Sequence, residues 1–170
     1  MASKYNDNDN IHFAEAESNY LLQEIFHIEA ENDISQNNNL EPAEIVLSAT
    51  AINTNNPFNS SEYADRLKKI LSDVEKEIDE LVNNFEKMTE THQNAYNSFV
   101  AIANSLFEDG VSVSKLIILI VFGYKWFTKC HRSIANSISI VMKFLYSFLM
   151  SDRIKSFVIL HGGWKKLLFQ

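Results

Sequence analysis

Apolar residues recur at helical spacing along most of this chain. Between residues 11 and 30 they fall near helical spacing, and a longer stripe of helical period runs from 63 to 85. Two more stripes cover 96–107 and 134–149. Because residues three and four apart share one face of an α-helix, each stripe predicts an amphipathic helix with one buried face.

One segment, residues 112–127, is apolar on nearly all sides, which is typical of a helix at the centre of a bundle. Its most apolar run, 116–122, is far shorter than the roughly 20 residues that a membrane-spanning helix needs. Short helices are also expected at about 152–161 and from Trp164 onward. The pattern therefore predicts an all-α protein, a bundle of about seven to eight helices around this central hydrophobic helix.

Polar segments mark the expected domain organisation. Residues 1–10 are polar, and we expect them to be disordered. Residues 11–170 have the length of a single helical domain. The stretch at about 31–60 is rich in Asn, Ser and Thr and holds both prolines, Pro42 and Pro57, so we expect a long flexible loop there.

The charge is unevenly distributed along the sequence. Residues 1–110 hold 21 acidic and 6 basic residues, whereas residues 111–170 hold 1 acidic and 9 basic residues, and the formal net charge is −7. The acidic total argues against nucleic acid as a partner. The basic C-terminal third would suit an anionic membrane surface, and it would equally suit a solvated protein face.

The sequence shows no pattern typical of a catalytic or metal site. The single cysteine, Cys130, excludes an internal disulfide, and it is adjacent to His131, so the two side chains would diverge on a helix. All four glycines lie at or after Gly110, which leaves no glycine-rich phosphate loop before it. We therefore expect no enzyme, no metal and no cofactor. The N-terminus has no apolar signal region, so an intracellular protein is expected.

Three short motifs near the C-terminus carry the most specific signal. Residues 105–111 read Ser-Leu-Phe-Glu-Asp-Gly-Val, residues 122–124 read Phe-Gly-Tyr, and residues 161–164 read His-Gly-Gly-Trp. In this order and spacing they resemble the first and second homology motifs of the Bcl-2 family of apoptosis regulators. The tripeptide is most similar to the effector branch represented by Bak.

This resemblance implies a surface groove that binds the amphipathic death-motif helix of pro-apoptotic relatives. Family members continue the first motif as Asn-Trp-Gly-Arg, whereas this chain continues it as Ser-Val-Ser-Lys at 112–115. The family arginine pairs with an aspartate of the incoming helix. Lys115 keeps the positive charge but lacks the planar guanidinium group, which can bind a carboxylate through two hydrogen bonds. The groove implied by the resemblance comprises Val74, Ile78, Leu81, Val82, Ile102, Leu106, Ser112, Ser114, Lys115, Ile118 and Phe122. For the apolar members, ordinary core packing is the competing interpretation.

The chain's own death segment departs from the family pattern. With Leu67 at the hallmark leucine, Leu71 and Ser72 stand where glycine and aspartate belong. This favours a pro-survival regulator over the alternative, a Bak-like effector that permeabilises the outer mitochondrial membrane. A helical scaffold without an apoptotic role is the third hypothesis. The resemblance implies a location at the outer mitochondrial membrane or in the cytoplasm, with a C-terminal anchor absent from this chain; membrane association and homodimerisation stay open.

Overall fold

The structure, a computed structural model, describes residues 3–51, 56–91, 95–130 and 137–170. These residues form eight α-helices and one 3-10 turn, and no strand occurs among them. The elements are α1 (Ser3–Ser35), α2 (Leu40–Ala49), η1 (Pro57–Asn59), α3 (Ser61–Thr91), α4 (Ala95–Leu106), α5 (Val113–Cys130), α6 (Ser137–Leu149), α7 (Asp152–Leu160) and α8 (Trp164–Leu167).

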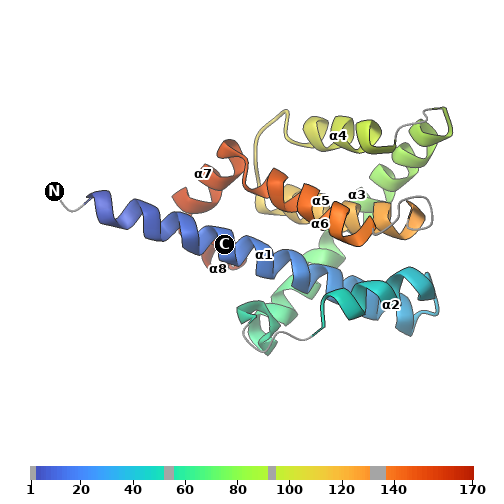
Figure 1. Cartoon of the computed structure of the whole chain (residues 1–170), viewed down its shortest axis with the longest axis horizontal. Helices are drawn as coiled ribbons and strands as arrows, with labels where there is room; N and C mark the ends of the chain where they lie inside the picture. Colours follow the sequence, from blue (N-terminus) through green and yellow to red (C-terminus); the bar gives the residue numbers. More distant parts are fainter. Residues whose placement is uncertain (1–2, 52–55, 92–94, 131–136) are drawn as a thin grey trace.

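Helix α5 lies at the centre of the bundle, as the sequence predicts. It packs against α1, α3, α4 and α6, and its residues Leu116, Ile117, Leu119 and Ile120 are fully buried. Figure 1 shows α1 crossing the molecule in front of α8, with α6 lying over α5 and α4 at one edge. The expected all-α bundle around a central hydrophobic helix is therefore confirmed.

The expected loop at about 31–60 is wrong for much of its length. Helix α1 continues to Ser35, α2 occupies Leu40–Ala49, and α1 begins at Ser3, within the segment expected to be disordered. Helix α2 is stabilised by burying Ala43 and Val46 against the bundle. Pro42 is tolerated because it stands in the first turn, where backbone N–H groups have no partner within the helix.

The connection between α1 and α2 behaves as its asparagines suggest. Asn37 and Asn39 adopt positive φ angles of 58° and 47°, a conformation that asparagine tolerates better than most residues. These two residues reverse the chain and set α2 alongside α1. The asparagine-rich composition therefore marks a tight turn between two helices.

Gly123 sets the distance between α5 and α6. A Cβ atom at this position would lie 2.5 Å from Cδ1 of Leu145, which is fully buried on α6. A side chain there would overlap the leucine. The glycine of the Phe-Gly-Tyr tripeptide thus permits the close contact between the two helices at the core of the bundle.

Candidate partner-binding site

The first homology motif forms the turn that joins α4 to α5. Gly110 adopts a φ of +126°, and its N–H donates to the carbonyl of Phe107 at 3.2 Å. Ser112 then caps α5: its hydroxyl accepts a hydrogen bond from the N–H of Lys115 at 3.3 Å, and its carbonyl accepts one from Leu116 at 3.1 Å. A serine here satisfies backbone donors that the first turn of a helix leaves without partners.

Lys115 lies half-buried in the first turn of α5. Its Nζ donates a hydrogen bond to the carbonyl oxygen of Gly110 at 3.2 Å. An ammonium group has three donors, so this contact orients the side chain and leaves donor capacity for a second acceptor. Ser114, one residue earlier, is exposed. The polar part of the predicted groove, namely Ser112, Ser114 and Lys115, therefore clusters at the N-terminus of α5.

The apolar part of the predicted groove is mostly buried. Leu81, Val82 and Leu106 are half-buried and pack against the core. The remaining members are at most 8% exposed and belong to the main hydrophobic core: Val74, Ile78, Ile102, Ile118 and Phe122. Helices α3, α4 and α5 contact one another, and these five side chains pack as core residues.

Phe122 illustrates this core packing. Its ring stacks on Phe99 of α4, with centroids 4.9 Å apart, and Phe99 also stacks on Trp126 at 4.8 Å. Phe99 is fully buried and also contacts Phe144 of α6 edge-on at 5.0 Å. This aromatic cluster fastens α4 to α5 and α6. Phe99 lies within the apolar stripe at 96–107, but spacing along the sequence does not reveal its central position in the cluster.

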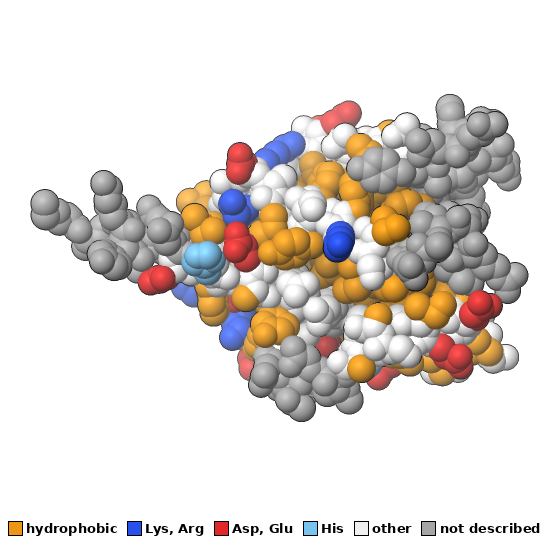
Figure 2. Space-filling view, in the orientation of Figure 1, with side chains coloured by type: hydrophobic (Ala, Val, Ile, Leu, Met, Phe, Trp, Pro, Cys, Tyr) orange, Lys and Arg blue, Asp and Glu red, His pale blue; other side chains and the backbone are white. Residues whose placement is uncertain are grey.

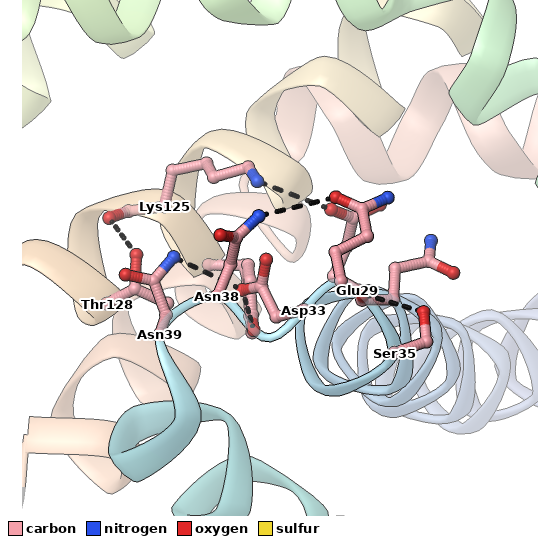
Figure 3. Close-up of polar contacts among 10 residues, drawn as sticks. Glu29, Asp33, Ser35, Asn38, Asn39, Lys125 and Thr128 are labelled. Carbon is pink, nitrogen blue, oxygen red and sulfur yellow. Dashed lines mark hydrogen bonds and ion pairs between the residues drawn. The ribbon is translucent and has the colours of Figure 1, made fainter.

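Polar contacts that the sequence analysis missed tie α1 to α5 (Figure 3). Asp33 is 6% exposed, and its Oδ2 accepts a hydrogen bond from the Tyr124 hydroxyl at 2.6 Å and one from Asn39 Nδ2 at 3.5 Å. One helical turn away, Glu29 forms an ion pair with Lys125 at 3.8 Å. These contacts border a cavity of about 370 Å³ between α1, α3 and α5, which Ile78 and Val121 also line.

Burial changes the acid–base properties of this α1–α5 contact. Burial raises the pKa of the Glu29 carboxyl, and the nearby Lys125 ammonium opposes that rise. Burial and the hydrogen bond to Asp33 raise the pKa of the Tyr124 hydroxyl far above its usual value, so this group stays protonated as the donor. In the sequence, this contact could have been suspected from Asp33, because this acidic residue falls on the same helical face as the buried apolar residues of α1.

Figure 2 shows how hydrophobic and charged side chains are distributed on one face of the molecule. Hydrophobic side chains gather over α6 in the middle of this face, while basic side chains are scattered singly. This face therefore presents no continuous cationic strip.

Within the residues that the structure describes, no helix is long and apolar enough to cross a membrane, and no three or more His, Cys, Asp or Glu residues gather as a metal site.

Comparison with known proteins bears directly on this arrangement of helices and motifs. Residues 67–164, more than half of the chain, match the family model described as "Apoptosis regulator proteins, Bcl-2 family". The chain belongs to the Bcl-2 family. The matched region contains the capped turn, the whole of α5 and the Gly-Gly-Trp motif, so the resemblance inferred from those motifs is confirmed.

One curated relative shows how far this similarity extends. The human protein "Bcl-2 homologous antagonist/killer" is 31% identical over 75 residues, which cover 44% of this chain. The match spans 36% of that relative's own length. The family model supports a regulator of apoptosis, and the chain spans only about a third of this relative's length.

Proposed function

We propose that this protein is a pro-survival member of the Bcl-2 family that binds the death-motif helix of pro-apoptotic relatives. The binding groove would lie between α3, α4 and α5. The observation that supports this proposal is the state of the chain's own death segment at the start of α3. Leu67, Ile70 and Val74 are at most 8% exposed, so its apolar face is committed to the protein's core.

The sequence of that segment supports the same conclusion. Leu71 is 8% exposed and occupies the position of the small residue that lets a death helix sink into a groove. Ser72 replaces the aspartate that would anchor it by charge. A segment without the small residue and the anchoring charge is a poor ligand for a neighbouring molecule, whereas α4 and α5 retain the elements of a receptor.

Lys115 would fix the register of the bound helix. Its ammonium, positioned by Gly110, would pair with the aspartate of the ligand, and the half-buried Leu81, Val82 and Leu106 would meet the first apolar anchors. Deeper anchors would reach Ile78 and Phe122 after α3 and α4 separate. Burial of these anchors would supply most of the affinity, and the charge pair mainly specificity.

The test is a titration of the protein against a panel of death-motif peptides. We expect selective binding at micromolar affinity or tighter, weakened by about tenfold or more in Lys115→Glu, because charge reversal replaces attraction with repulsion. Lys143→Glu, on the exposed face of α6, is the matched control and should bind as the unmodified protein does. Absence of binding across the panel would contradict the proposal and favour the helical scaffold.

A Bak-like effector is the second candidate, supported by the 31% identity to the human antagonist/killer protein. An effector would release dye from liposomes of mitochondrial lipid composition after addition of an activating peptide. The pro-survival proposal predicts no release by this protein and reduced release by a known effector mixed with it. Release by the protein alone with peptide would reverse the assignment.

A further inference from the structure

A buried carboxylate joins α1 to the Gly-Gly-Trp motif. Glu17 is 2% exposed, and its Oε2 accepts a hydrogen bond from the backbone N–H of Trp164 at 2.9 Å. The next residue, Ser18, is 1% exposed, and its hydroxyl accepts a hydrogen bond from the Trp164 indole Nε1–H at 2.8 Å. We call these two contacts the α1–Trp164 clasp. It joins the first helix to the last.

Gly163 allows the clasp to form. The residue adopts a φ of +94°, and a Cβ atom there would lie 3.1 Å from Oε2 of Glu17. The glycine therefore brings the backbone close to the carboxylate and turns the chain from α7 into α8. Trp164 is fully buried, as expected of a core anchor, so opening the clasp would expose a large apolar side chain as well as the carboxylate.

The carboxylate is incompletely satisfied. Oε1 of Glu17 is buried and has no hydrogen-bond partner in the structure. The charged group that acts on Glu17 is Lys165 of α8, which favours ionisation together with the backbone N–H groups of Trp164 and Lys165. Burial outweighs these effects and raises the pKa of the Glu17 carboxyl. Ionising Glu17 at this buried site is therefore costly.

We propose that ionisation of Glu17 loosens the α1–Trp164 clasp, so that the contact between α1 and α8 is tight when the carboxyl is neutral and weaker when it is charged. A neutral carboxyl still accepts the hydrogen bond from Trp164, and it removes the buried charge. Once α1 lifts, water can solvate the ionised group. This device is independent of groove binding, and it would make the release of α1 responsive to pH.

The direction of the pH effect on the clasp follows from the linkage between proton binding and clasp closure. The clasped state binds the proton more tightly than the open state does, because burial raises the pKa of the Glu17 carboxyl above its ordinary value of 4.5. The stabilisation is fully present below about pH 4.5 and is lost as pH rises through the raised value. The clasp should therefore open more at pH 8 than at pH 5.

The test uses Trp164 as its own reporter. In the full chain carrying Trp126→Phe, Trp164 is the remaining tryptophan, and acrylamide quenching of its fluorescence measures its exposure. We expect quenching to rise severalfold and reversibly between pH 5 and pH 8. Glu17→Gln keeps an acceptor oxygen for Trp164 without a charge, so its quenching should stay low across the range.

Glu29→Gln is the matched control, since Glu29 is another carboxyl on α1 whose pKa is raised by burial. It should keep the pH response at Trp164. The proposal is overturned if quenching does not change with pH, if Glu17→Gln responds as the parent does, or if Glu29→Gln abolishes the response. Should Trp126→Phe fail to fold, hydrogen exchange of residues 161–168, corrected for intrinsic rates, makes the same comparison.

Discussion

At the scale of single residues, the most informative side chains are polar ones that occupy apolar positions. Glu17, Ser18 and Asp33 lie on the buried stripe of α1, where Leu21 and Ile25 supply the ordinary core contacts. Each of the three finds a partner on an element distant in the sequence. Periodicity alone predicts that such positions are buried, but the partners are known only once the fold brings them together.

The contact between Tyr124 and Asp33 yields a stability prediction. Tyr124→Phe removes the donor and leaves a buried carboxylate with one fewer hydrogen bond, so we expect a loss of about 1–3 kcal/mol in the free energy of unfolding. Urea denaturation followed by circular dichroism measures it. Tyr146→Phe, at a half-buried position on α6, is the comparison and should change stability much less. Equal effects would mean that the Tyr124 hydrogen bond contributes nothing of its own.

At the scale of helices, the sequence pattern predicts α3, α4 and α6, which carry apolar stripes, and α5, which is apolar on nearly all sides. It fails for α2, since the asparagines and prolines around that helix have loop-like composition. Helix α2 forms because Ala43 and Val46 find a surface on the bundle, a tertiary effect that no local pattern records. The same limit applies to the groove: the family resemblance implied Ile118 and Phe122 as groove residues, but their burial depends on how the surrounding helices pack over them.

The contact between α5 and α6 gives a prediction at this scale. Gly123→Val places a branched side chain against Leu145, and we expect destabilisation of about 2–3 kcal/mol from overpacking. Leu145→Ala alone should also destabilise the protein, through the cavity it leaves. In the double variant the valine occupies that space, so the combined loss should be smaller than the sum. Additive losses in a double-mutant cycle of urea denaturation would show that the two positions are not in contact.

At the scale of the whole molecule, three carboxyls on α1 share one tendency. Burial raises the pKa values of Glu17, Glu24 and Glu29 above the usual glutamate range. Their contribution to stability is therefore complete below about pH 4.5 and declines as pH rises through the raised values. The first helix is the element whose attachment is most sensitive to this change.

We accordingly expect the midpoint of thermal unfolding to fall as pH rises from 5 to 8. The triple variant Glu17→Gln, Glu24→Gln and Glu29→Gln should show a flatter profile over the same range, because those three protons no longer exchange on unfolding. Differential scanning calorimetry at matched ionic strength measures both profiles. Parallel profiles for the parent and the triple variant would show that other groups determine the pH dependence.

The length of α3 has a mechanical consequence. This helix runs without interruption from Ser61 to Thr91, a rod of about 46 Å at 1.5 Å per residue. Its first half carries the chain's own death segment together with Val74, which also belongs to the proposed groove, and its second half carries the groove residues Ile78, Leu81 and Val82. A continuous helix is stiff, so one end of α3 cannot move away from the bundle while the other end stays packed against it. The protein could thus not bind a partner helix in the groove and expose its own death segment at the same time. A bound partner helix would keep the death segment packed against the core.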